Sequence, residues 1–181
     1  TSDLKSLISQ LENCLEIYQQ FNDLQKSHQD YQKQLWEKVQ ILSDYSGSKS
    51  SLQSKLKKVQ ELQDNIPDGH NRIKILSDHV EKKGNILPPR AKEAMARDVS
   101  NLVVDFGKYI SALADVRRGL EERLQHWSEY ETTHEKLLGW LAEAELTLKN
   151  YTPRATLPEK SDQLDKYQVR FFSILYLSNF P

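Results

Sequence analysis

The sequence predicts an all-α protein built from tandem three-helix bundles, antiparallel and left-handed, in which successive repeats share helices. Apolar residues recur every three or four positions along most of the chain, a spacing typical of helices packed in a bundle. The pattern itself also recurs, because residues 21–42 align with residues 127–148 at an offset of 106 and place Phe21 on Trp127. A period of this length indicates structural units stacked end to end.

Composition narrows the class of protein. The 25 Lys and Arg residues against 26 Asp and Glu residues give a net charge of -1 and no clustered basic surface. Nucleic-acid phosphates require such a surface, so no nucleic-acid partner is predicted. The single cysteine, Cys14, cannot form an internal disulfide and indicates a reducing compartment. No run of about 18 apolar residues is present, so neither a transmembrane segment nor a secretory signal is predicted.

The first predicted helix occupies residues 1–45. One heptad pattern of apolar residues, here called the frame, continues through this helix. Lys38 is the single position that breaks it, because its side chain is charged. We interpret residues 1–20 as the end of the third helix of a preceding repeat, and residues 21–45 as the first helix of a complete repeat. The frame contains Leu4, Leu7, Leu11, Cys14, Tyr18, Phe21, Leu42 and Tyr45.

The second predicted helix runs from Ser50 to Lys83, after a turn at residues 46–48. A proline inside a helix removes a backbone donor and costs about 3 kcal/mol. Pro67 therefore predicts a kink or a short non-helical bulge, and Gly84 with the following asparagine predicts the helix end. The stripe of this helix consists of Leu52, Leu56, Val59, Leu62, Ile66, Ile73, Leu76 and Val80.

The third predicted helix begins at Pro89, since proline is tolerated in a first turn. It reaches about Gln125 and completes a repeat over residues 21–126. No proline interrupts the apolar stripe between Val99 and Tyr151. The third helix of one repeat and the first helix of the next are therefore expected to be one continuous helix.

The second repeat is expected to be incomplete. Residues 127–168 supply its first helix and the start of a second, for which Thr156 and Glu159 have the spacing of a capping box. Leu164 then corresponds to Leu56 of the first repeat if a two-residue insertion is allowed. Residues 169–181 are mostly apolar and depart from the pattern, so we interpret them as a variant tail that resembles a splice-variant or read-through ending.

Several short sequence motifs in the predicted first helix of the second repeat resemble those of spectrin repeats. They are the aromatic Trp127, the Gly139-Trp140-Leu141 core and the Glu143-Ala144-Glu145 continuation to Leu148. The resemblance covers about residues 1–168 and implies the bundle fold with shared helices. It is weakened by Trp36, which is displaced by two positions, by Pro67, and by the tail.

Other strings are similar to the nesprins, the spectrin-repeat proteins of the nuclear envelope. They are residues 120–127, 148–151 and 165–168. This resemblance implies a non-catalytic rod or scaffold that connects the nuclear envelope or other membranes to the actin cytoskeleton. It also implies protein partners, and a location in the cytoplasm, at the cytoskeleton and on the cytoplasmic face of the outer nuclear membrane.

Catalytic and ligand-binding interpretations are weak. His134 and Glu135 begin a zinc-protease motif, but Leu138 stands where the second histidine is required. His28 and His134 lie on the apolar stripe and are expected to pack in the bundle. His70 and His79 lack a third partner for a metal. We therefore predict no enzyme activity, no cofactor, no metal and no small-molecule ligand.

The two incomplete ends predict self-association as a dimer or a head-to-tail chain. A lone helix at the N-terminus and a helix pair after residue 126 each leave an apolar stripe that lacks a partner within one chain. The alternative function is that of a discrete module that binds a protein or a membrane through the apolar tail. Pairing of the tails of two chains is a further alternative. The candidate contact residues are Leu4, Leu7, Leu11, Cys14, Trp140, Leu141, Leu148, Leu164, Phe171, Phe172 and Ile174.

Overall fold

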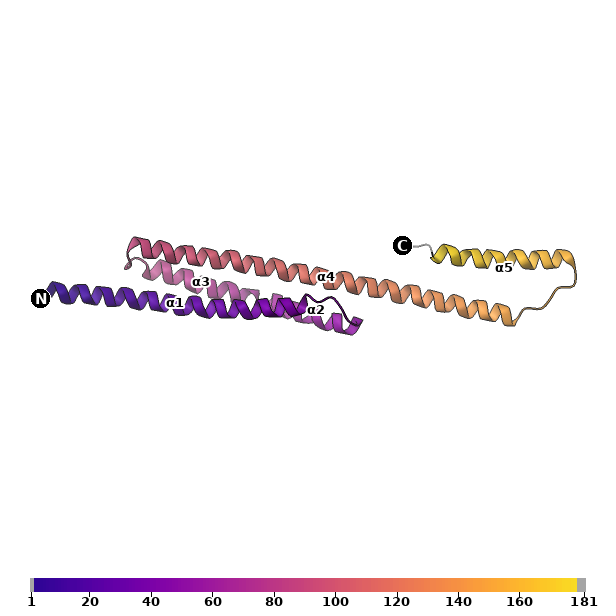
Figure 1. The fold of residues 1–181 in the computed structure, drawn as a ribbon, viewed down its shortest axis with the longest axis horizontal. Helices are drawn as coiled ribbons and strands as arrows, with labels where there is room; N and C mark the ends of the chain where they lie inside the picture. Colours follow the sequence, from indigo (N-terminus) through magenta and orange to yellow (C-terminus); the bar gives the residue numbers. More distant parts are fainter. Residues whose placement is uncertain (1, 179–181) are drawn as a thin grey trace. The chain divides into compact units, whose positions relative to one another are not determined.

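The computed structural model describes the backbone of residues 2–178 and the side chains of residues 3–169. The regular structure of this part is entirely helical, which confirms the all-α prediction (Figure 1). The chain divides into two units, Thr1–Tyr130 and Glu131–Pro181. The helices are α1 (Ser2–Leu42), α2 (Lys49–Asp64), α3 (Ile66–Lys83), α4 (Pro89–Lys149) and α5 (Leu157–Ser178).

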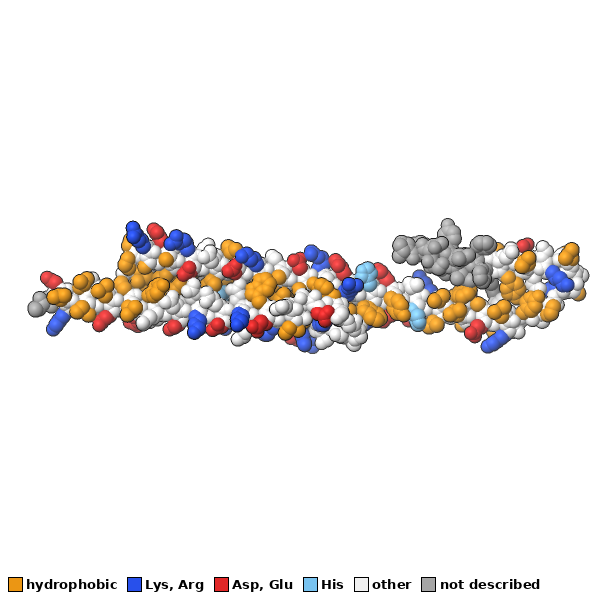
Figure 2. All heavy atoms as spheres, in the orientation of Figure 1, with side chains coloured by type: hydrophobic (Ala, Val, Ile, Leu, Met, Phe, Trp, Pro, Cys, Tyr) orange, Lys and Arg blue, Asp and Glu red, His pale blue; other side chains and the backbone are white. Residues whose placement is uncertain are grey.

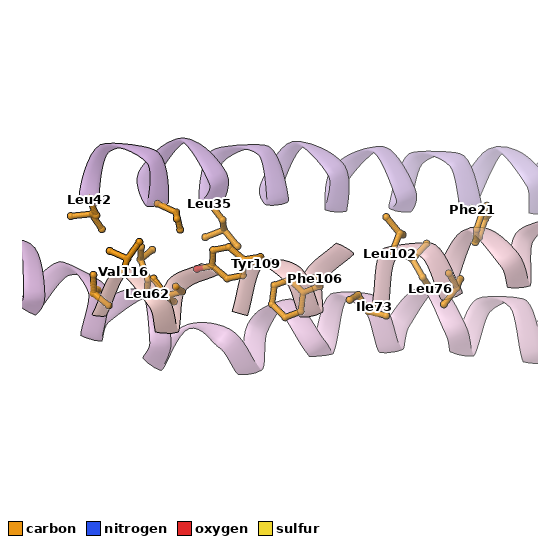
Figure 3. Packing of buried hydrophobic residues seen from close by; sticks show 14 of the residues in the cluster. Phe21, Leu35, Leu42, Leu62, Ile73, Leu76, Leu102, Phe106, Tyr109 and Val116 are labelled. Atoms are coloured by element: carbon orange, nitrogen blue, oxygen red, sulfur yellow. The ribbon is translucent and has the colours of Figure 1, made fainter. Parts of the chain in front are cut away.

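The first unit is a bundle of three helical layers. Helix α1 forms one layer, α2 and α3 together return along it, and the N-terminal part of α4 forms the third (Figure 1). Their apolar faces meet in one cluster, where Leu35, Leu62 and Tyr109 come from α1, α2 and α4 (Figure 3). The helices of this unit therefore pack as one three-layered bundle, and the repeat boundaries at residues 21 and 126 remain a prediction.

Helix α1 follows the predicted frame except at Lys38, where the neighbouring Val39 is buried instead, and at Tyr18. Ile17 is buried and Tyr18 is 47% exposed, so the prediction that Tyr18 lies in the core is wrong. The core-facing position between Cys14 and Phe21 can be three residues after Cys14, which is Ile17, or four residues after it, which is Tyr18. Both residues are apolar or aromatic and both spacings fit a helix, so the sequence permits either. Helix α1 also ends at Leu42, earlier than the predicted residue 45.

The turn between α1 and α2 is fixed by polar contacts. The Lys55 ammonium donates to the backbone carbonyls of Asp44 and Ser46 and to the Asp44 carboxylate. The Ser46 amide donates to the same carboxylate, and these contacts lower the pKa of Asp44 to about 2. Gly47 has a φ of 117°, a left-handed conformation that favours glycine. Ser48 then caps α2 by accepting from the backbone three residues on.

The predicted interruption of the second helix is confirmed as a break at Asn65. The Asn65 side-chain amide donates to the Glu61 backbone carbonyl at 2.9 Å, and the Asn65 backbone carbonyl accepts from the Asp68 backbone amide at 3.1 Å. Pro67 thus lies in the first turn of α3, where a missing N–H costs little. The predicted single helix is therefore two helices that follow one another.

Beyond the break, Gly69 allows α3 to approach α4 closely. A Cβ atom at this position would lie 2.1 Å from Cζ of Phe106, closer than side chains tolerate. Phe106 is itself buried and stacks on Tyr109 with ring centroids 5.5 Å apart. The layer of the core around Phe106 therefore depends on the absence of a side chain at Gly69.

Helix α4 supplies the longest buried stripe. Gly84 ends α3 in a right-handed conformation with a φ of -64°, and α4 begins at Pro89 as predicted. The helix continues without interruption past Trp127 to Lys149, so the prediction of one continuous helix is confirmed, although Tyr151 lies beyond its end. Its buried residues are Met95, Val99, Leu102, Phe106, Tyr109, Leu113, Val116 and Leu120.

The second unit consists of the end of α4 and α5. The Thr156 amide and hydroxyl both donate to the Glu159 carboxylate, which confirms the carboxylate half of the predicted capping box. Helix α5 then runs through Val169 to Ser178. No side chain that the structure describes between residues 131 and 169 is fully buried. This unit therefore lacks a core of its own in the described part.

Leu113→Ala tests the core of the first unit. Leu113 has no exposed surface, so its truncation leaves a cavity and should lower the free energy of unfolding by about 2–5 kcal/mol. Val104→Ala on the exposed face of the same helix is the control and should change it by less than about 0.5 kcal/mol. Urea unfolding followed by circular dichroism measures both, and an equal effect of the two substitutions would contradict the assigned core.

A second prediction compares two glycines. Gly69→Ala should destabilise the bundle by about 1–3 kcal/mol, because the new methyl group overlaps the Phe106 ring. At Gly107 a Cβ would meet nothing within 4 Å, so Gly107→Ala should stabilise α4 by about 0.5–1 kcal/mol. Opposite signs in the same unfolding assay are expected. Stabilisation by Gly69→Ala would show that α3 and α4 are farther apart than described.

Candidate interaction surfaces

The N-terminal part of α1 carries an exposed apolar row. Leu4, Leu7 and Leu11 are 65%, 53% and 61% exposed, as expected for a helix that extends beyond its own bundle. Hydrophobic side chains gather along this end of α1 in Figure 2. A row of large apolar residues at helical spacing is stabilised by burial against other helices, so this surface is a candidate contact site.

Two residues of this row were not among the sequence candidates. Ile8 and Leu15 are more than half exposed and lie beside the predicted frame. With Leu4 and Leu11 they follow the spacing of four, three and four residues that keeps side chains on one helix face. The apolar character of these two residues is visible in the sequence. A strict heptad pattern, however, selects only one residue from each adjacent apolar pair, and it selects Leu7 over Ile8 and Cys14 over Leu15.

Cys14 differs from the three leucines with which it was grouped. It is partly buried and packs against the core of the first unit. Its thiol lies 3.5 Å from the carbonyl oxygen of Ile86, in the loop between α3 and α4. Cys14 therefore marks the place where α1 enters its own bundle, although the adjacent Leu15 is still exposed.

The second unit carries another exposed apolar row. Leu141 and Leu148 of α4 and Leu164 of α5 are exposed. Trp140 is instead partly buried. The partly buried residues Trp140, Ala144 and Thr147 share one face of α4, while those of α5 are Gln163 and Tyr167.

These partly buried faces indicate where α4 and α5 approach each other. The Tyr151 and Tyr167 rings lie with centroids 6.0 Å apart, and Gln163 donates to the Thr152 carbonyl at 3.1 Å. The loop that follows α4 thus contacts α5 through one pair of aromatic rings and one hydrogen bond. The exposed leucines remain available to another helix.

Three candidate residues cannot be placed by their side chains. Phe171, Phe172 and Ile174 lie outside the residues whose side chains are described. Their backbone belongs to α5, which ends at Ser178. The predicted boundary between residues 168 and 169 does not coincide with a helix end, and the tail remains a prediction.

The histidines have different surroundings. His28 is buried in the first unit, as its position on the apolar stripe predicted. His70 meets the Phe106 ring edge-on, and His79 lies 3.0 Å from the Ile17 carbonyl oxygen. His134 is exposed, so the prediction that it packs like His28 is wrong, because the second unit supplies no closed core around it.

The described residues contain no group of three or more His, Cys, Asp or Glu side chains placed to hold a metal ion. None of the helices, as far as they are described, combines the length and the apolar character needed to cross a membrane.

The fold and surfaces define an all-α protein with a complete helical bundle and a helix that continues into a second unit. No family model and no solved structure matches the chain. Over 166 residues, or 92% of its length, the chain is 46% identical to Muscle-specific protein 300 kDa of Drosophila melanogaster. It spans about 1% of the length of that protein. The matching region is thus a small part of a very large relative.

Proposed function

We propose that the chain is a non-catalytic rod or scaffold segment of a large protein, built from spectrin-type repeats. The observation that carries this proposal is the continuity of α4 from the core of the first unit into the second. A helix that serves two successive units transmits position along a tandem array, as in other repeat proteins. Similarity to a very large muscle protein supports the same role.

The more specific role rests on the resemblance to nesprins. In that role the parent protein connects the nuclear envelope or other membranes to the actin cytoskeleton, and this segment is one of its spacers. Its partners are proteins, including cytoskeletal or nuclear-envelope proteins, and it binds neither nucleic acid nor a small-molecule ligand. Its location is the cytoplasm, at the cytoskeleton and on the cytoplasmic face of the outer nuclear membrane.

Solution scattering tests the rod. A spacer should have a radius of gyration well above the roughly 16 Å expected for a compact domain of this length. Small-angle X-ray scattering on the monomer, identified by light scattering, measures it. A radius close to the compact value would contradict the rod. In muscle cells, a tagged parent protein lacking this segment should keep its location but change the spacing between its ends.

Self-association is a second candidate function, favoured by the exposed apolar rows in both units. We propose that the α1 row of one copy, Leu4, Leu7 and Leu11 with Cys14 at its edge, completes the α4 and α5 pair of another. The residues on the receiving side are Trp140, Leu141, Leu148 and Leu164, extended by Phe171, Phe172 and Ile174. Three apolar helix faces would then be buried where one chain supplies only two.

Charge substitutions test this association. Leu11→Glu and Leu141→Glu should each raise the dissociation constant at least tenfold, because burial of an unpaired carboxylate opposes the contact. Val104→Glu, on an exposed face outside both rows, is the matched control and should leave it unchanged. Concentration-dependent light scattering measures the effect. A monomeric wild type at tens of micromolar would contradict the proposal.

The alternative is that residues 169–181 bind a protein or a membrane surface directly. Removal of residues 171–181 distinguishes the two. If the shortened chain loses binding to vesicles or to the cytoskeletal fraction while Leu11→Glu retains it, the tail is the contact site. If the shortened chain behaves as the full chain does, this alternative is wrong.

A further inference from the structure

The core of the first unit contains an ionisable side chain for which it provides no ion-pair partner. His28 of α1 is only 1% exposed, and neither ring nitrogen has a hydrogen-bond partner among the described residues. The Gln32 side chain lies near the ring and favours its protonation, but it does not meet the geometry of a hydrogen bond to either nitrogen. An imidazole so placed is tolerated as a neutral group and is costly as a cation.

The surroundings of His28 come from all three layers of the bundle. Phe106 of α4 meets the imidazole edge-on at 6.2 Å, and Tyr31 of α1 lies at 6.3 Å. Tyr109 of α4, which stacks on Phe106, has a hydroxyl that is likewise buried without a partner among the described residues. Burial raises the pKa of Tyr109 to about 12, so it remains neutral and cannot balance a positive charge.

The charged groups that face His28 come from α3. The Arg72 guanidinium packs over the Tyr31 ring, 4.5 Å from its centroid, and its positive charge acts on the imidazole. Asp68 is already paired with Arg72 at 3.0 Å. His70, also on α3, packs against Phe106 from another direction. A proton on His28 would therefore meet a cation and an already engaged carboxylate.

We propose that His28 is a proton-sensitive element of the bundle, whose protonation loosens the packing of α1 against α3 and α4. The position is well suited to this effect, because α3 begins at the Asn65 break and its first turns contact Phe106 through Gly69 and His70. The layer formed by α2 and α3 is interrupted at Asn65, so the backbone hydrogen bonds of one helix do not continue into the other. Local opening of this layer is therefore easier than that of one continuous helix. The device deepens the proposed scaffold role but does not depend on it.

The direction of the pH effect follows from the shift in pKa. Burial, and then the positive charge of Arg72, lower the pKa of His28 below its ordinary value of 6.5. A group with a lowered pKa in the folded state binds protons more readily when unfolded. Its contribution to stability is thus fully present above pH 6.5, and is lost as the pH falls below 6.5 toward the folded pKa.

Urea unfolding of the full chain at pH 7.5 and pH 5.5 tests the proposal. If His28 is unprotonated in the folded state at both values, it alone makes the unfolding equilibrium constant rise about tenfold between them. His28→Leu should remove this part of the pH dependence, whereas His126→Gln, at an exposed histidine, should leave it in place. An unchanged pH dependence in His28→Leu would overturn the proposal.

A direct titration keeps the proposal testable if His28→Leu does not fold. Nuclear magnetic resonance of the wild-type imidazole signals should show His28 titrating below pH 6.5, with broadening of α1 and α3 signals as it does so. Arg72→Met should move the pKa of His28 upward, because it removes a neighbouring positive charge. A folded-state pKa at or above 6.5, or titration without any change in α1 and α3, would overturn the proposal.

Discussion

Burial of one apolar stripe on α4 is the constraint on which the bundle depends. Eight residues from Met95 to Leu120 are buried, and they meet α1 on one side and the α2 and α3 pair on the other. Burial of an apolar side chain contributes about 1.5–3 kcal/mol, whereas helix propensity contributes only tenths of a kcal/mol per residue. Tertiary packing, rather than local preference, therefore contributes most of the stability of these helices.

The same constraint explains the different character of the two units. Where three layers enclose the stripe, residues such as Leu113 and Leu120 lose all exposed surface. Where α4 has only α5 beside it, Leu141 and Leu148 remain exposed on the same helix. One continuous secondary-structure element thus passes from a closed core to an open surface. The contrast reflects how many neighbours the chain supplies at each position.

Much of this organisation could be predicted from the sequence, because helix-period patterning and proline position are local signals. The stripe from Val99 to Leu120 and the break before Pro67 are examples, and both agree with the structure. Tyr18 and Ile17 could not be separated, because two stepping patterns fit the same helix. The exposure of His134 could not be predicted either, because its spacing matches that of His28 and the two differ only in the described helices that surround them.

The candidate contact residues show the same limit. Apolar character identified Leu4, Leu7 and Leu11, yet nothing in their spacing showed that Cys14 would already pack beside the loop that follows α3. Such a contact joins residues 72 positions apart. It depends on the length of the bundle and on the place where α3 ends, which are properties of the assembled unit.

The break at Asn65 has a consequence for how the bundle opens. Helices α2 and α3 are 16 and 18 residues long, near the length at which an isolated helix is only marginally stable in water. Each therefore depends on its neighbours for its own structure, and fraying can begin at the internal ends as well as at the outer ones. Amide protons around the break would then exchange with solvent through local openings, ahead of those in the middle of α4. A continuous second helix would offer no such internal starting point, so we expect partial unfolding of this bundle to begin at the break as well as at its ends.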